Sequence, residues 1–245
     1  MVWLIVLAVI ILAGLILYWQ LILAEGAYLG APLVTLLYDW TAERYNKIKA
    51  FDEFGETLTL GMPLANRLHA QPEATVLDVA TGTGRIPQVL LRQSTYRGHI
   101  IGLDRASKML AVARRDTAHG SGRVTFIQAD AMALPFATNS LPLVTCLEAL
   151  EFLPNPEKGL AELVRVLQPA LPHHPGRGWL VTTNRIGWEA RFMPGKTWSR
   201  QRLQEVLNNL PLQHIDIKIW EDIYDLIWAQ KMDIDRSTHD PDACG

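Results

Sequence analysis

The chain has 245 residues, of which 49% are hydrophobic and 20% charged, a composition too apolar for an intrinsically disordered protein. Its 23 Lys and Arg residues nearly balance its 25 Asp and Glu residues, whereas nucleic-acid-binding proteins usually carry a basic excess, so we predict no nucleic-acid partner. Two cysteines exclude a disulfide framework, and the seven histidines show neither HxxxH nor HExxH spacing. We therefore expect no metal site.

Residues 1–24 contain no Asp, Glu, Lys or Arg. A helix of this length covers about 36 Å, enough to cross a hydrocarbon core about 30 Å thick. Trp3 near one end, and Tyr18 and Trp19 near the other, suit the two interfaces of a membrane. The absence of Lys and Arg before the apolar run disfavours a cleaved signal peptide, and a buried core helix of this length and uniformity is uncommon. We predict a transmembrane anchor over residues 1–24.

Basic residues follow this segment and none precedes it. Arg44, Lys47 and Lys49 are the first Lys and Arg residues in the chain. Because basic residues are retained on the cytoplasmic side, the expected arrangement is a single-pass membrane protein with a cytoplasmic catalytic domain.

Residues 25–71 form a helical N-terminal extension in which apolar, aromatic and basic residues recur at helical spacing. Two interpretations stay open: a helix packed on its own domain, or an interfacial helix or substrate lid. The residues that would line one face are Leu33, Leu36, Leu37, Trp40, Arg44 and Tyr45.

Residues 72–232 alternate between short apolar runs and amphipathic segments. Strands are predicted over 74–80, 99–104, 123–130, 141–150, 178–184, 213–220 and 223–231, with helices over 85–93, 107–119, 156–168 and 199–209. Ser107 is the expected N-cap of the second of these helices. Such alternation predicts an α/β fold with a Rossmann-like, seven-stranded, mostly parallel sheet and helices on both faces. The polar tail over residues 233–245 is expected to be disordered.

A glycine-containing turn, TGTG, follows the first predicted strand. Gly82 and Gly84 let the backbone approach a ligand closely, but Gly pairs are also common in plain turns. A nicotinamide dinucleotide site would need a third glycine where the chain has Pro87. Asp78, at the end of the strand, would repel a pyrophosphate and instead suits a cationic ligand such as S-adenosylmethionine.

Carboxylates also end the next two strands. Asp104 is placed to accept hydrogen bonds from the hydroxyls of a ribose, and Asp130 from an adenine amino group. Taken alone, each of these aspartates is better explained as a turn residue or helix cap, but three acidic strand ends around one glycine loop favour a nucleoside site. Met109 either packs on the adenine or belongs to a helix core.

Three segments together carry a resemblance to a known family: LDVATGTGR, IGLDRASKMLAVAR and FIQADAMALPFATNSLPLVTCLEALEFLPNPEKGLAELVRVLQP. They resemble class I S-adenosylmethionine-dependent methyltransferases, and among these the type 11 group that includes ubiquinone/menaquinone biosynthesis C-methyltransferases. The resemblance covers roughly residues 40–185 and rests on the combination of motifs.

The resemblance implies S-adenosyl-L-methionine as the cofactor, with the first strand and its loop on the methionine part, the second strand end on the ribose and the third on the adenine. The cofactor-binding residues expected on this basis are Asp78, Ala80, Gly82, Gly84, Asp104, Arg105, Met109, Asp130 and Ala131. Leu141-Pro142 replaces the family's usual Phe-Asp, and PALPHHPGRG replaces a shorter turn. These departures leave the identity of the acceptor open.

Methyl transfer from a sulfonium chiefly requires alignment of the two reactants and exclusion of water. Methylation of an acidic phenol can also call for a base, for which Glu148 is a weak candidate and His69 and Glu151 are weaker. We expect an enzyme that methylates a small, lipophilic or membrane-presented acceptor. The alternative is a catalytically degenerate, membrane-anchored module that binds a nucleoside or a partner. The sequence does not define the oligomeric state.

Overall fold

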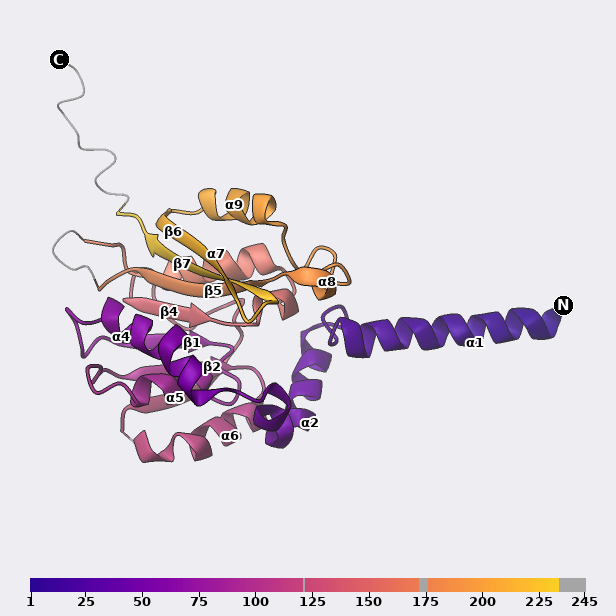
Figure 1. The fold of residues 1–245 in the computed structure, drawn as a ribbon, viewed down its shortest axis with the longest axis horizontal. Helices are drawn as coiled ribbons and strands as arrows, with labels where there is room; N and C mark the ends of the chain where they lie inside the picture. Colours follow the sequence, from indigo (N-terminus) through magenta and orange to yellow (C-terminus); the bar gives the residue numbers. More distant parts are fainter. Residues whose placement is uncertain (121, 172–175, 234–245) are drawn as a thin grey trace, which may run out of the picture.

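The computed structural model describes residues 1–120, 122–171 and 176–233. Figure 1 shows an α/β domain from which one long helix projects. The predicted disordered tail, from residue 234 onward, and part of the loop before the fifth strand lie outside the described residues.

The projecting helix is α1 (Val2–Tyr18), continued by a wider helical turn, η1 (Trp19–Leu23). Together Val2–Leu23 form 22 helical residues of mean hydropathy 2.8, and no residue of α1 is buried. The last part of the predicted anchor behaves differently, because Gln20 and Ala24 are buried against the domain. The structure therefore separates an exposed helix from a short segment that packs on the domain.

The sheet has seven strands in the order β3-β2-β1-β4-β5-β7-β6. They are β1 (Val76–Val79), β2 (Ile100–Asp104), β3 (Val124–Gln128), β4 (Leu143–Cys146), β5 (Trp179–Arg185), β6 (Leu212–Trp220) and β7 (Tyr224–Lys231). The first five are mutually parallel, and β7 runs antiparallel to both β5 and β6. This confirms the predicted Rossmann-like, mostly parallel sheet.

Helices cover both faces of the sheet. Apolar side chains of α7 (Pro156–Val166) and α9 (Arg200–Asn208) join one core cluster, whereas those of α4 (Met62–Arg67) and α5 (Arg85–Leu91) join another. The helix α6 (Ser107–Asp116) packs against β2, β3 and the long helix α2 (Ala31–Lys49). Short elements complete the chain: α3 (Glu53–Glu56), η2 (Thr57–Gly61), η3 (Ala118–Gly120), η4 (Leu150–Phe152) and α8 (Gly187–Ala190).

Side chains cap several helices, but not as predicted for α6. Asn155 accepts a hydrogen bond from the Lys158 amide, and Ser199 caps α9 in the same way. The predicted cap Ser107 is wrong, because Ala106 occupies the N-cap position and Ser107 is the first helical residue. Asp39 of α2 accepts a hydrogen bond from the Lys108 amide in the first turn of α6, and Asp104 accepts one from the amide of Ala106 itself.

Of the two interpretations left open for α2, packing of the face with Leu36 and Trp40 on the domain does not describe the structure. Val34 and Ala42 are buried on this helix, whereas Leu36 and Trp40 are 61% and 81% exposed. The helix has two apolar faces. The face toward the domain is harder to recognise in the sequence, because its apolar residues are interspersed with polar ones.

Candidate active site

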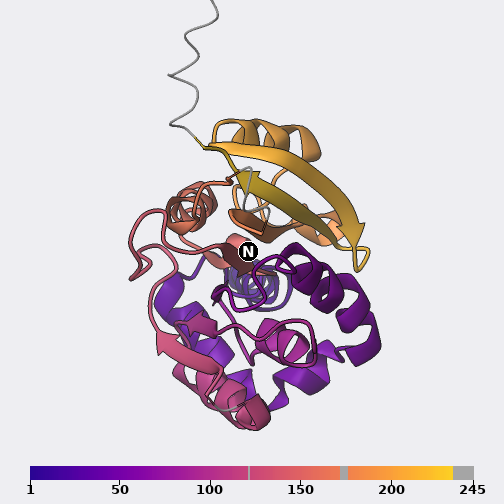
Figure 2. The same ribbon diagram turned by 90° about the vertical axis from the view of Figure 1, so that its left-hand side faces the viewer.

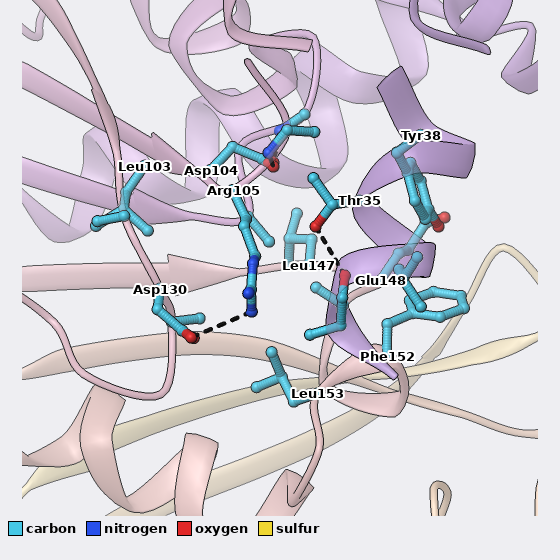
Figure 3. Close-up of a pocket in the computed structure, with 18 of the residues that line it drawn as sticks. Thr35, Tyr38, Leu103, Asp104, Arg105, Asp130, Leu147, Glu148, Phe152 and Leu153 are labelled. Atoms are coloured by element: carbon cyan, nitrogen blue, oxygen red, sulfur yellow. Dashed lines mark hydrogen bonds and ion pairs between the residues drawn. The ribbon is translucent and has the colours of Figure 1, made fainter. Parts of the chain in front are cut away.

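A pocket lies at the carboxyl ends of the parallel strands, where the strand order reverses between β1 and β4. Ligands of open α/β sheets bind at such a switch point. Its walls come from α2, the loop after β1, the ends of β2 and β3, and the segment after β4. Figure 3 shows Thr35 and Tyr38 on one side, with Asp104, Arg105 and Asp130 opposite.

The loop after β1 has an unusual backbone. Ala80, Gly82 and Gly84 all have positive φ, at 55°, 53° and 84°. A Cβ built on Gly82 would meet nothing within 4 Å, and Gly82 lines the pocket. The glycine therefore leaves open a space at the pocket wall that a ligand can approach.

Asp104 holds this loop in place. Its two carboxylate oxygens accept hydrogen bonds from the backbone amides of Gly82 and Ala106, each at 2.8 Å. Burial raises the pKa of Asp104, while these amide hydrogen bonds oppose the rise. A carboxylate oxygen can accept more than one hydrogen bond, so Asp104 can still accept one from a ribose hydroxyl at the pocket.

Asp78 lies deeper, beside a smaller pocket that shares Ala80, Gly82 and Glu148 with the first. The Thr145 hydroxyl donates to Asp78 Oδ1 at 2.6 Å. Burial raises the pKa of Asp78 to about 7. A cationic ligand group beside this carboxyl would favour its ionised form.

Asp130 and Arg105 lie together at the opposite end of the main pocket. Asp130 Oδ1 accepts from the Met132 amide at 2.9 Å, and Oδ2 pairs with Arg105 at 3.3 Å. Ala131 also lines the pocket. Met109 does not line either of these pockets; it packs in the cluster between α2 and α6, which favours its interpretation as a core residue.

Glu148 faces both pockets but is held by two cations. Lys49 Nζ lies 2.6 Å from its carboxylate, and Arg85 pairs with the other oxygen. The pKa of Glu148 is lowered: burial opposes ionisation, but the charges of Lys49 and Arg85 outweigh it. An ionised, paired carboxylate is a weak proton acceptor, although it can still orient a hydroxyl group.

The two weaker base candidates, His69 and Glu151, do not line either of the two pockets at the site. His69 contacts the Asn66 carbonyl oxygen through Nδ1. Glu151 is buried, and burial raises its pKa to about 7. Tyr224 donates to Glu151 Oε1 at 3.2 Å, while Oε2 has no hydrogen-bond partner among the described residues.

The sequence interpretation missed Arg85 and the aromatic wall. Arg85 begins α5, where the helix dipole disfavours a cation, and that position was a signal for carboxylate partners. Tyr38 and Phe152, whose ring centroids are 5.8 Å apart, form an apolar wall of the pocket. Their sequence separation concealed this pairing.

Comparison with known proteins decides the family. A family model described as a methyltransferase domain matches residues 76–170. The chain is 30% identical to the demethylmenaquinone methyltransferase of Desulfitobacterium hafniense over 197 residues, which cover 75% of this chain and 78% of that protein. The chain belongs to the S-adenosylmethionine-dependent methyltransferases. It is therefore an enzyme whose cofactor is S-adenosyl-L-methionine, and it is similar to methyltransferases of quinone biosynthesis.

Other similarities are shorter or more distant. The demethylmenaquinone methyltransferase of Thermus thermophilus is 32% identical over 133 residues, which cover 54% of this methyltransferase and 60% of that one. The [4+2]-cyclase SpnF superposes with a TM-score of 0.57 at 20% identity, over 71% of this chain and 80% of that chain. The second similarity concerns the fold alone, which hosts more than one chemistry.

Proposed function

We propose that this methyltransferase is anchored in a membrane by α1 and methylates a carbon atom of a lipophilic, quinol-type acceptor. The observation that carries the proposal is an apolar and aromatic pocket wall, formed by Val34, Tyr38 and Phe152, opposite the acidic strand ends. The names of the relatives support a quinone-related acceptor. The exposed apolar helix supports a membrane location.

The described residues fit the cofactor at the acidic side of the pocket. Asp78 would hold its cationic amino group, and the open space above Gly82 would admit its methionine chain. Asp104 would accept from the ribose hydroxyls, and Asp130 with Ala131 would contact the adenine. The apolar wall then remains for the acceptor.

The protein's part in the reaction is alignment. The bound cofactor supplies a methyl group on a positively charged sulfur, ready for in-line displacement. Tyr38 and Phe152 would hold an aromatic acceptor against that methyl group and exclude water. Glu148 would accept a hydrogen bond from an acceptor hydroxyl and thus favour electron density on the ring. The proton that the acceptor carbon loses then leaves to solvent.

A direct assay tests this proposal. The full chain in lipid vesicles is incubated with methyl-labelled S-adenosylmethionine and a demethylated naphthoquinol. Label should appear in a product heavier by one methylene unit. Cofactor binding without label transfer to this acceptor, to other quinols or to lipid extracts would overturn it.

Asp104→Ala should weaken cofactor binding by at least tenfold, because a hydrogen bond to a charged group is worth about 1.5–3 kcal/mol. Calorimetry measures the affinity, and thermal unfolding verifies that the variant folds. Asp216→Ala is the matched control, since Asp216 lies on β6 and pairs with Lys218. Equal affinity in the two variants would remove Asp104 from the site.

A further inference from the structure

The helix α1 leaves the domain from the edge that carries the pocket. In Figure 1 the axis of α1 is nearly aligned with the parallel strands, although the chain runs the opposite way, and α1 extends beyond the carboxyl ends of the strands. Figure 2, which looks along that direction, shows α1 end-on within the outline of the domain. A membrane crossed by α1 would therefore face the edge of the sheet that carries the pocket.

Apolar side chains cover part of this edge. On α2, Leu33, Leu36 and Trp40 are exposed, and their spacing of three and four residues places them on one helical face. We call these three residues the α2 stripe. The other face of the same helix lines the pocket through Val34, Thr35 and Tyr38. The α2 stripe is thus separated from the pocket by the thickness of one helix.

A second apolar group adjoins the base of α1. Trp188 is 57% exposed and Phe192 is 38% exposed, and their rings pack edge to face with centroids 5.7 Å apart. We call these two residues the aromatic pair. Trp19 Nε1 donates to the Phe192 carbonyl at 2.9 Å, and the Tyr28 hydroxyl donates to the Pro194 carbonyl at 2.7 Å. These bonds fix the aromatic pair beside the end of α1.

We propose that the α2 stripe and the aromatic pair rest in the interface of the lipid bilayer that α1 crosses, so that the acceptor enters the pocket from the lipid. Trp, Phe and Leu are the side chains that amphipathic segments insert into a membrane interface. Continuity with α1 argues for lipid as the occupant, because α1 holds this edge against whatever membrane it spans. The inference rests on the proposed anchoring by α1.

Quenching by nitroxide-headgroup lipids tests the contact in the full chain reconstituted in vesicles. A fluorophore is attached in turn at Leu36→Cys, Trp188→Cys and Met232→Cys, with the native Cys244 replaced by serine. Met232 is the matched control: it is 38% exposed and follows β7, which runs antiparallel to β5 and so ends at the opposite edge. Strong quenching is expected at positions 36 and 188, and little at 232.

Failure of the inference is distinguishable from failure of the anchoring. A fourth label, at Leu12→Cys within α1, reports insertion through quenching by lipids that carry the nitroxide in the acyl chain. If the label at position 12 is quenched while the labels at positions 36 and 188 are quenched no more than the label at 232, the inference is overturned and the anchor stands. Position 12 unquenched would overturn the anchoring and the inference together.

A kinetic comparison tests the entry route. The double variant Leu36→Ser/Trp40→Ser should raise the KM for a membrane-embedded quinol by about tenfold, through lost apolar contact with the bilayer. The KM for S-adenosylmethionine and the turnover of a water-soluble naphthoquinol should not change. An equal rise for both acceptors would show that the stripe acts on the pocket itself, and an unchanged KM for the embedded quinol would overturn the entry route.

Discussion

At Gly82 the backbone conformation predicts the effect of a substitution on stability, and the open space beside it predicts the effect on cofactor binding. A side chain at φ +53° costs about 1 kcal/mol, a cost that the neighbouring Ala80 already bears at φ 55°. Gly82→Ala should therefore lower the unfolding temperature slightly, but weaken cofactor binding roughly tenfold because its methyl group enters the pocket. Calorimetry and thermal unfolding measure the two effects.

Gly195→Ala is the control for this experiment. Gly195 also has a positive φ, 74°, and a Cβ there would meet nothing within 4 Å, but it does not line the two pockets at the site. Both variants should lose similar stability, and only Gly82→Ala should lose affinity. If Gly82→Ala unfolds while Gly195→Ala does not, the glycine is chiefly structural.

Two buried carboxyls predict how stability depends on pH. Burial raises the pKa of Asp78 and of Glu151 to about 7, above the ordinary value near 4 in the unfolded chain. Their contribution is fully present below that ordinary pKa and is lost as pH rises through 7. The free energy of unfolding without cofactor should therefore fall between pH 5 and pH 8, by up to about 3 kcal/mol for each carboxyl.

Substitution separates the two groups. Glu151→Gln and Asp78→Asn should each flatten the dependence of the unfolding temperature on pH, because a neutral amide does not ionise. Glu151→Gln leaves Arg185 its ion pairs with Glu25 and Glu189 and should keep cofactor affinity. Asp78→Asn should lose affinity as well. A stability that rises from pH 5 to pH 8 would contradict the assigned direction of both pKa shifts.

Arg85 connects three elements that are distant in sequence. Its guanidinium carbon Cζ lies 4.5 Å from the ring centroid of Phe51 and 4.6 Å from that of Trp220. It pairs with Glu56 on α3, with Glu148 after β4 and with Glu221 in the β6–β7 turn. The N-terminal extension is thereby fastened to the sheet beside the site.

Lysine cannot replace this planar, multiply bonded guanidinium. Arg85→Lys would leave the buried carboxylates of Glu56 and Glu148 under-paired, and it should cost about 3 kcal/mol of unfolding free energy. Chemical denaturation measures this loss. Arg115→Lys, at an exposed pair with Glu43, should change the unfolding midpoint little. Equal effects of the two substitutions would contradict a structural role for Arg85.

The contrast between the strands and these contacts explains how far the sequence could predict the structure. A buried parallel strand such as β1 or β4 is one short, mostly apolar run, so its composition and flanking turns locate it. On α2, by contrast, Leu36 and Trp40 are larger apolar residues than Val34 and Ala42, so a hydrophobic pattern assigns them to the core. In the structure they face outward. The partners of Arg85 lie up to 136 positions away, and local pattern carries no such information.

The candidate site divides in the same way. The carboxyl ends of parallel strands share one edge of a sheet, so Asp78, Asp104 and Asp130 could be brought together from topology alone. The hydrogen bonds from Gly82 and Ala106 to Asp104 depend on loop dihedrals. The ion pairs that suppress the basicity of Glu148 depend on the packing of α2 and α5. Short sequence motifs predict neither these hydrogen bonds nor these ion pairs.

At the scale of the whole molecule, the projecting helix and the domain meet at Trp19 rather than at residue 24. Trp19 donates to the Phe192 carbonyl, Gln20 and Ala24 are buried, and Ala24 packs in a cluster with Ala27 and Met193. Removing α1 alone should therefore leave the packed part of the domain untouched, whereas removing residues 1–24 should not.

We predict that a chain lacking residues 1–18 is soluble, unfolds at the temperature of the full-length protein and keeps its affinity for S-adenosylmethionine. A chain lacking residues 1–24 should also be soluble but less stable, by about 2 kcal/mol, because the apolar contacts of Trp19 and Ala24 are lost. Thermal unfolding and calorimetry compare the three proteins.

Both shortened chains should act less efficiently on a membrane-embedded quinol, since the anchor raises the effective concentration of acceptor. The chain lacking only residues 1–18 should retain full activity on a water-soluble analogue. Equal stability of the two shortened chains would place the junction after residue 24, and full activity of either on the embedded quinol would remove α1 from acceptor delivery.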